Sequence, residues 1–309
     1  MGRADVYLQP DAPDPILDPA VVRALARRHR PDAGDVVEVD ETGGEARAYL
    51  LDHGIVVKTQ RPHRRRQRTS LAKEAALLSH LSAAGLADRI PVLYGYDTAQ
   101  TDAGAVEYLC MSRIPGRAVV ATQPPDSARP QMLADLAGLL RTIHDAGPPP
   151  GPAADTIPAD TGEGLRRRLQ YWFADLSDLP QPGQLPVPLA DITSAALTML
   201  PDVLPGVVLL HSNPGPTHTF IDPGLGRLTG IIDFGDAYLS HPAMDLRAWP
   251  DPADRQLLHD AYRDGHADDP VFDRVWTVAM LYADAAAIVM GNRYAEAAAA
   301  DLTHQLRRL

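Results

Sequence analysis

Two polar segments in the second half of the chain hold residue types that phosphoryl transfer requires. The first is HSNPGPTH at residues 211–218, which follows four apolar residues and precedes a strand pattern. The second is IIDFGD at residues 231–236, where a strand pattern delivers Asp233 just ahead of a glycine. An acid at the end of a strand is a candidate metal ligand, and a loop of polar residues and turn formers can position an acceptor hydroxyl. Each segment taken singly occurs by chance in many chains.

A lysine and a glutamate in the first half complete an ordered set. The chain has only two lysines, Lys58 and Lys73, so Lys58 inside an apolar strand pattern stands out. Glu74 lies in the helix pattern that follows. Phosphoryl transfer needs a lysine on the donor phosphates, a glutamate that fixes it, a metal-binding acid and a positioning loop. The joint pattern indicates this chemistry, although Lys58 on an edge strand and Glu74 on a solvated helix face are the alternatives.

Length and composition limit the class of protein. The 309 residues suffice for one large or two smaller domains, and no stretch approaches the roughly 20 apolar residues of a membrane helix. The N-terminus has early prolines and acids and lacks the apolar core of a signal peptide. A single cysteine, Cys110, excludes an intrachain disulfide. We therefore expect a soluble, cytoplasmic protein.

The net charge is concentrated in the second half. Residues 1–150 hold 18 basic and 19 acidic side chains, whereas residues 151–309 hold 11 and 21, a net of −10 out of −11. An acidic surface attracts cations and repels nucleic acid and anionic lipid. We expect no nucleic-acid or membrane partner. Plain solubility and a cation-binding cleft both remain open as the reason for the acidity.

The elements that must position these residues change in type along the chain. Strand patterns cover residues 36–40, 46–51 and 54–60, with two more near 92–96 and 106–111, and helix patterns cover 19–30 and 70–84. The turn at residues 41–45 contains adjacent glycines. We predict a small antiparallel sheet with one helix, preceded by a leader and helix in residues 1–34.

From residue 112 onward the pattern is mainly helical. Residues 112–116 break the strand pattern and indicate a hinge, and the Pro/Gly-rich stretch 147–164 predicts a loop without regular structure. Strands are expected at 207–210, 219–221 and 228–233. Helices are expected at 131–145, 165–177, 189–200, 252–265 and 271–309, the last with a break near Gly291.

This arrangement resembles the aminoglycoside phosphotransferase-like, or choline-kinase-like, small-molecule kinases, whose fold is similar to that of protein kinases. The resemblance runs from about residue 36 to the C-terminus and is most specific at residues 108–116, 211–222 and 228–237. It implies a two-lobed α+β fold. Residues 1–111 would form a small antiparallel β lobe that binds nucleotide, and residues 112–309 a larger helical lobe with the catalytic loop and acceptor site.

The resemblance also implies roles for single residues. Lys58 would contact the α- and β-phosphates of ATP or GTP, with Glu74 as its ion-pair partner. Asp233 would be the main Mg²⁺ ligand, and Asp245 would brace the catalytic loop. The nucleotide-binding residues expected are Thr42, Gly43, Gly44, Lys58, Glu74, Ser112 and Ile114, of which the last two act through their backbone.

Two positions depart from the family pattern. Asn213 stands where the family has its catalytic aspartate, and an amide oxygen is not basic enough to take a proton at pH 7. Because the transition state is loose, positioning and electrostatics supply most of the rate, and Asp236 is a second candidate for accepting the proton. His218 replaces an asparagine that ligates metal. Histidine here resembles divergent members such as hygromycin-type kinases, and an imidazole can bind metal or phosphate. A histidine that only satisfies the turn is the alternative.

Two hypotheses follow from Asn213. In the first, the chain is an active O-phosphotransferase with catalytic residues Asn213, Asp233 and Asp236, and with Mg²⁺ on Asp233 and His218. Its acceptor would be a small hydroxylated molecule, for which a cationic antibiotic such as an aminoglycoside suits the acidic half and would imply antibiotic resistance. In the second, it is a pseudokinase that binds nucleotide or a metabolite without transfer.

Overall fold

The chain is divided into two compact units. The computed structural model describes residues 7–67, 70–102, 104–179 and 184–308. The first unit comprises Met1–Gly116 and two later segments, Pro149–Thr156 and Thr229–Asp236. The second unit comprises Arg117–Pro148, Ile157–Leu228 and Ala237–Leu309. The predicted α+β class, with an antiparallel sheet followed by a mainly helical part, is confirmed.

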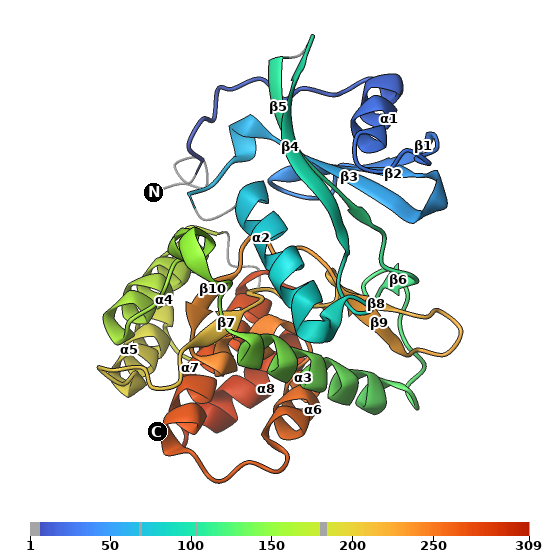
Figure 1. Ribbon diagram of the computed structural model, residues 1–309. Helices are drawn as coiled ribbons and strands as arrows, with labels where there is room; N and C mark the ends of the chain where they lie inside the picture. Colours follow the sequence, from blue (N-terminus) through green and yellow to red (C-terminus); the bar gives the residue numbers. More distant parts are fainter. Residues whose placement is uncertain (1–6, 68–69, 103, 180–183, 309) are drawn as a thin grey trace. The chain divides into compact units, whose positions relative to one another are not determined.

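The first unit is built on a five-stranded antiparallel sheet in the order β1-β2-β3-β5-β4 (Figure 1). The strands β4 and β5 are longer than predicted, because their hairpin stays in register out to Thr101 and Gly104. The outer part of β4 is polar and largely exposed, so its sequence carries no alternation. The strands are β1 Val36–Asp40, β2 Ala46–Leu51, β3 Ile55–Gln60, β4 Leu93–Thr101 and β5 Gly104–Ser112.

Two helices pack against this sheet through different residues of β5. Tyr108 and Cys110 belong to the core cluster of α1 (Pro19–Arg27), whereas Leu109 packs with residues of α2 (Leu71–Leu81). Successive side chains of a strand point to opposite faces, so α1 and α2 cover opposite sides of β5. The helix predicted after the leader is present as α1, and its apolar face belongs to the core of the sheet.

The start of α2 determines which way Glu74 points. Ser70 caps the helix by accepting a hydrogen bond from the Lys73 N–H at 3.3 Å. Glu74 then lies in the first turn with none of its surface exposed. The solvated helix face considered for Glu74 is therefore wrong.

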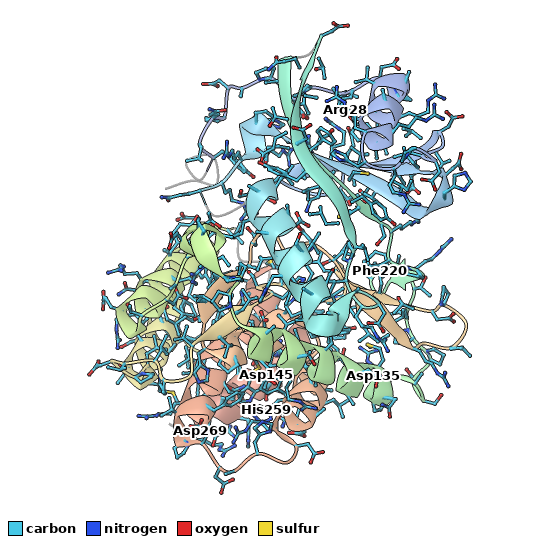
Figure 2. All side chains as sticks on the ribbon, in the orientation of Figure 1. Arg28, Asp135, Asp145, Phe220, His259 and Asp269 are labelled. Carbon is cyan, nitrogen blue, oxygen red and sulfur yellow. The ribbon has the colours of Figure 1, made fainter. Side chains whose placement is uncertain are left out.

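The second unit is mainly helical, and α7 is its central element. It packs against α4, α5 and α8. Asp269 caps α7 and Pro270 follows as its first residue, the usual signals of a helix start (Figure 2). The predicted break near Gly291 is present. The helices are α3 Arg129–Ala146, α4 Gly162–Ser177, α5 Leu189–Met199, α6 Pro252–Arg263, α7 Pro270–Val289 and α8 Ala295–Leu306.

Short strands frame the two polar segments. In the second unit, β7 (Val208–Leu210) pairs with β10 (Tyr238–Ser240), and β6 (Arg117–Ala118) pairs with β8 (Thr219–Ile221), both antiparallel. The strand β10 was not predicted, because three residues are too few for a periodic signal. The strand predicted at 228–233 is β9, Leu228–Ile231, so Asp233 lies beyond its end.

The prediction that residues 147–164 lack regular structure is wrong. A 3₁₀ helix covers Gly151–Thr156, and α4 begins at Gly162. Thr161 caps α4 by accepting from the Gly164 N–H, so two glycines in the first turn did not prevent the helix. None of the described helices is both long and apolar enough to cross a membrane.

Candidate active site

In the first unit, the ammonium group of Lys58 lies between two carboxylates. Its Nζ is 2.7 Å from Glu74 Oε2 and 2.7 Å from Asp233 Oδ1. Lys58 comes from β3, Glu74 from α2, and Asp233 from the segment after β9. Three residues separated by as many as 175 positions in sequence therefore meet at one cation.

The surroundings keep Lys58 charged. Its side chain is 13% exposed and that of Glu74 is 1% exposed. Burial alone would lower the pKa of Lys58, but the charges and hydrogen bonds of Asp233 and Glu74 outweigh it and raise that pKa above its usual value. The site thus holds a fixed positive charge at neutral pH, with Asp233 as its more exposed partner at 39%.

The segment that carries Asp233 is anchored to the first unit by its backbone. Thr229 Oγ1 donates to Pro115 O at 2.6 Å, and the Ile231 N–H donates to Arg89 O at 2.9 Å. A Cβ on Gly230 would lie 2.3 Å from the same Arg89 oxygen, so only glycine fits there. Asp233 itself has a left-handed backbone, with φ +73°. Such strain persists where neighbouring contacts hold the residue, as at functional sites.

In the second unit, Asp245 holds the loop that follows β7. Its Oδ2 accepts from the His211 N–H at 2.8 Å, and its Oδ1 accepts from the Ser212 N–H at 2.7 Å. His144 Nε2 on α3 lies 3.2 Å from Oδ2, and its Nδ1 lies 2.8 Å from the Tyr262 hydroxyl. The carboxylate is fully buried.

This network keeps Asp245 ionised in spite of its burial. Burial raises a carboxyl pKa, but the hydrogen bonds of His144 and of the His211 backbone N–H more than offset it and lower the pKa of Asp245. The two loop N–H groups therefore point at a buried negative charge. Ser212 adopts φ +87° at this place, which the paired hydrogen bonds enforce.

Residues after Asp245 hold the rest of the loop. Trp249 Nε1 donates to Pro214 O at 3.1 Å, and Arg247 Nη1 donates to Ser212 O at 3.2 Å. A Cβ on Gly215 would lie 2.6 Å from Ala248 O, so the loop approaches this segment more closely than any side chain allows. Residues 245–249 thus hold the loop through contacts to its backbone.

Asn213 is exposed at the tip of this braced loop. Its N–H donates to His211 Nδ1 at 3.3 Å, and its carbonyl oxygen lies 2.9 Å from His218 Nδ1. A carbonyl only accepts, so Nδ1 of His218 carries the proton. In neutral imidazole the lone pair is then on Nε2, the form in which histidine binds metals.

The predicted nucleotide turn lies between β1 and β2. The backbone N–H and hydroxyl of Thr42 donate to Asp40 Oδ1 at 2.8 and 2.6 Å, and Gly43 O accepts from Arg61 at 3.4 Å. Gly44 has open space at its Cβ position. The turn is ordered by its own contacts, and its part in nucleotide binding stays a prediction.

The predicted hinge residues continue the sheet. The Ser112 N–H donates to Val92 O at 2.9 Å, and Ser112 Oγ accepts from the Val92 N–H at 2.8 Å. The Ile114 side chain is buried. This N–H of Ser112 is therefore committed to the protein, and the base contacts of both residues stay predictions. Asp236, three residues after Asp233, is half-buried in the first unit, and its part in proton transfer is likewise a prediction.

No metal cluster is formed by protein groups alone in the described parts of the chain, where no three His, Cys, Asp or Glu side chains gather suitably. Asp233 and His218 therefore stay predicted ligands that would need a nucleotide or water to complete a metal's shell. This is usual for Mg²⁺, which keeps several waters and substrate phosphates.

Sequence reasoning missed several residues of the second unit. His144, Arg247 and Trp249 all support the loop, and Trp172 on α4 lies with its ring centre 4.4 Å from the Arg247 guanidinium carbon. They are distant in sequence from residues 211–218, and no spacing rule links them. The nearest signal was Asp245 itself, which the resemblance assigned to the support of the catalytic loop.

A kinase-like phosphotransferase is the class that this fold and these two sets of residues define. Residues 36–275, well over half of the chain, match the phosphotransferase enzyme family. The chain belongs to that family and is a kinase-type enzyme for hydroxyl groups of small molecules. No curated protein sequence matches the chain.

Solved structures of similar fold cover nearly the whole chain. The GDP complex of wild-type aminoglycoside 2′-phosphotransferase-IIIa has a TM-score of 0.59 at 17% identity, covering 94% of this chain and 98% of that one. The streptomycin–ATP–APH(2″)-IIa ternary complex has 0.56 at 15%, covering 93% and 97%. The apoenzyme of macrolide 2′-phosphotransferase MphH from Brachybacterium faecium has 0.53 at 21%, covering 92% and 97%. At these identities the likeness concerns the fold.

The close approach at Gly215 predicts a loss of stability on substitution. Gly215→Ala places a methyl group 2.6 Å from Ala248 O and should lower the free energy of unfolding by about 1–3 kcal/mol. Denaturant unfolding measures this. The matched control is Gly44→Ala, where the added methyl group meets nothing within 4 Å. Equal stability of the two variants would contradict the geometry.

The buried charge of Asp245 predicts a pH dependence. Its pKa is depressed below the usual 3.8 in the folded protein, so its contribution is fully present above about pH 4 and disappears as the pH falls through the folded pKa. Relative to Asp245→Asn, the wild type should be more stable at pH 6, and the difference should shrink below pH 4. Urea unfolding at several pH values tests this, and a constant difference would show that the carboxylate charge is irrelevant.

Proposed function

We propose that this chain transfers the γ-phosphoryl group of ATP or GTP to a hydroxyl of a small molecule, with Mg²⁺ as cofactor. The observation that carries the proposal is Lys58, held between Glu74 and Asp233 at 2.7 Å from each. Kinases use such a lysine on the donor phosphates and such an aspartate on the metal. The two nucleotides named in the solved relatives, GDP and ATP, support either donor.

In the donor site, each residue has a separate task. Lys58 would neutralise the α- and β-phosphates, and buried Glu74 would fix the lysine in place. The Thr42–Gly44 turn would cover the phosphates, and the backbone of Ser112 and Ile114 would contact the base. Lys58 needs no proton transfer for its task, because its raised pKa keeps it cationic.

Asp233 fits the role of main magnesium ligand. It is a carboxylate, the ligand type that Mg²⁺ prefers, and it is the more exposed of the two acids on Lys58. His218, with its proton placed on Nδ1, would be the second ligand through Nε2. When bound, the metal would neutralise charge that develops on the transferring phosphoryl group.

Asn213 would position the acceptor hydroxyl without acting as a strong base. Its side-chain oxygen can accept a hydrogen bond from that hydroxyl. Its backbone is held on both sides by His211 and His218, so the amide is presented from a fixed loop. Because the transition state is loose, the hydroxyl can lose its proton late, and Asp236 is the proposed group to receive it.

The acceptor would lie beside this loop in the second unit. Arg247 joins Ser212 to the Trp172 ring, which itself packs against Tyr282 at 5.1 Å between ring centres. The proposed aromatic wall, Trp172 with Tyr282, is linked through Arg247 to the residue before Asn213, and its rings would suit the face of a sugar. The net charge of −10 in residues 151–309 favours a cationic acceptor, so an aminoglycoside or another cationic antibiotic is the first class to test.

The role of Asn213 is tested by restoring a carboxylate. Asn213→Asp should raise kcat by about 10²–10⁴-fold, the usual contribution of a general base, with KM for the nucleotide little changed. Turnover of Mg²⁺–ATP and Mg²⁺–GTP with an acceptor measures this. A wild type that binds nucleotide but never turns over, beside an active Asn213→Asp, would instead establish the pseudokinase.

The metal site is tested by Asp233→Asn, which should weaken Mg²⁺-dependent nucleotide binding about tenfold or more, since it removes a charged oxygen ligand. Calorimetry with and without Mg²⁺ separates the metal from the nucleotide. Asp222→Asn is the control, because this acid lies at the loop after β8 and accepts hydrogen bonds from Gly224 and Leu225. Unchanged binding in Asp233→Asn would overturn the site assignment.

The acceptor site is tested with a panel of aminoglycosides, macrolides and uncharged sugars. Trp172→Ala should raise KM for the preferred acceptor about tenfold through lost ring contact, and leave KM for the nucleotide unchanged. Tyr171→Ala is the control, because Tyr171 is 46% exposed and adjacent in sequence. If both variants change KM equally, the proposed aromatic wall is wrong.

A further inference from the structure

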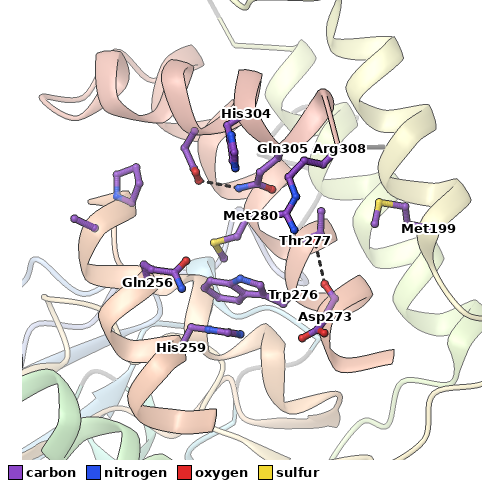
Figure 3. Close-up of a pocket in the computed structure, with 13 residues that line it drawn as sticks. Met199, Gln256, His259, Asp273, Trp276, Thr277, Met280, His304, Gln305 and Arg308 are labelled. Atoms are coloured by element: carbon purple, nitrogen blue, oxygen red, sulfur yellow. Dashed lines mark hydrogen bonds between the residues drawn. The ribbon is translucent and has the colours of Figure 1, made fainter. Parts of the chain in front are cut away.

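A cavity of about 610 Å³ lies among the C-terminal helices of the second unit (Figure 3). None of residues 211–218 lines it, so it is separate from the loop that carries Asn213. Its volume falls within the range of small-molecule sites. Its apolar lining includes Trp276 and Met280 of α7, and its polar lining comes from side chains of α6, α7 and α8.

Buried polar atoms without a hydrogen-bond partner occur on α6, α7 and α8, the helices around this cavity. Among the described residues, four buried side-chain atoms without a hydrogen-bond partner come from α6, α7 and α8: Arg255 Nε, His259 Nε2, Asp284 Oδ2 and Gln305 Oε1. His259 and Gln305 line the cavity. Each such atom costs about 1–3 kcal/mol, and a ligand in the cavity could supply the bonds missing at His259 and Gln305.

The polar groups next to the cavity are mainly acceptors. His259 Nδ1 is 3.0 Å from the Asp260 carboxylate, which only accepts, so in the neutral ring Nε2 is an acceptor. Gln305 Nε2 donates to Asp301 at 2.7 Å, and its unpartnered atom is the carbonyl oxygen. Asp273 and Asp301 add two carboxylates to the lining, against one cationic side chain, Arg308.

An aromatic surface accompanies these acceptors. The Trp276 ring stacks on His259 with 4.7 Å between ring centres and 25° between planes. The face of a tryptophan attracts organic cations. Acceptor atoms, two carboxylates and an indole together suit a ligand that carries several N–H donors and positive charge.

We propose that α6, α7 and α8 form a second ligand site, which binds a small organic amine cation and acts on the loop that carries Asn213. Its ligand donates hydrogen bonds to His259 Nε2 and Gln305 Oε1 and pairs with Asp273. The proposal does not depend on the phosphotransferase reaction, since the binding needs no nucleotide.

A buried series of contacts connects the cavity with the loop at residues 211–218 within the second unit. Gln256 of α6 lines the cavity and follows Arg255, which forms an ion pair with Asp284. Arg255 Nη1 donates to Trp249 O at 3.1 Å, and Trp249 Nε1 donates to Pro214 O at 3.1 Å. A ligand that shifts α6 therefore acts on the support of Pro214, next to Asn213.

The test is calorimetry of the full chain with spermidine, without nucleotide and at constant ionic strength. Wild type should show saturable binding at one site, and the uncharged polyol sorbitol should show none. His259→Phe keeps the ring stack but removes Nε2, and Asp273→Asn removes a charge. Each should weaken spermidine binding about tenfold, as for one lost charge-assisted hydrogen bond.

Glu296→Gln is the matched control, because Glu296 is an exposed acid in the first turn of α8, as Asp273 is in the first turn of α7. It should bind spermidine as the wild type does. Absence of saturable binding in the wild type, or equal losses in Asp273→Asn and Glu296→Gln, would overturn the site. Thermal unfolding of each variant identifies any that fails to fold, and in that case Gln305→Leu replaces it.

Hydrogen exchange tests the connection to the loop. Spermidine should slow exchange of the amides at residues 211–219 in the wild type and leave it unchanged in His259→Phe. Binding without this protection would refute the action on the loop. Asp233→Asn should still bind spermidine, so failure of the amine site and failure of the proposed phosphotransfer give different results.

Discussion

The carboxylate of Asp245 is the interaction on which the second unit depends. It is fully buried and accepts hydrogen bonds from two successive backbone N–H groups of the loop after β7. A buried charge is tolerated only when it is fully hydrogen-bonded, so the loop and the carboxylate stabilise each other. The strained backbone of Ser212 persists because both bonds require it. His144 and Tyr262 bring α3 and α6 into the same network.

A different constraint governs the first unit, where one cation joins three chain segments. The Lys58 side chain is only 13% exposed, and each of its two carboxylates offsets part of the cost of taking it out of water. The segment with Asp233 reaches this cation because Gly230 allows its backbone to pass against Arg89. The chain returns to the first unit at Thr229–Asp236, and this return places the Asp233 carboxylate beside Lys58.

The contacts that hold the loop backbone determine how the Asn213 side chain could act. An amide in a mobile loop would offer little to an acceptor hydroxyl, but here the backbone on both sides is fixed by His211 and His218. Positioning accounts for a large part of catalysis in phosphoryl transfer, and in the proposed reaction the loop would supply it without a basic side chain. In that proposal, proton transfer is the step in which Asn213 would differ from the aspartate of the family pattern.

Sequence alone determined the class of fold, the family resemblance and the residues that could do chemistry. Lys58, Glu74 and Asp233 were singled out from residue type, order and strand or helix period, because those signals are local, and Asn213 was singled out from the family resemblance. The tertiary structure decided which residues distant in sequence come into contact. It placed Glu74 inside, made β10 the partner of β7, and brought His144, Arg247 and Trp249 to the loop. It also created the cavity among α6, α7 and α8. These features depend on packing between residues far apart in the chain. The spacing of residues in a single sequence does not show which of them come into contact.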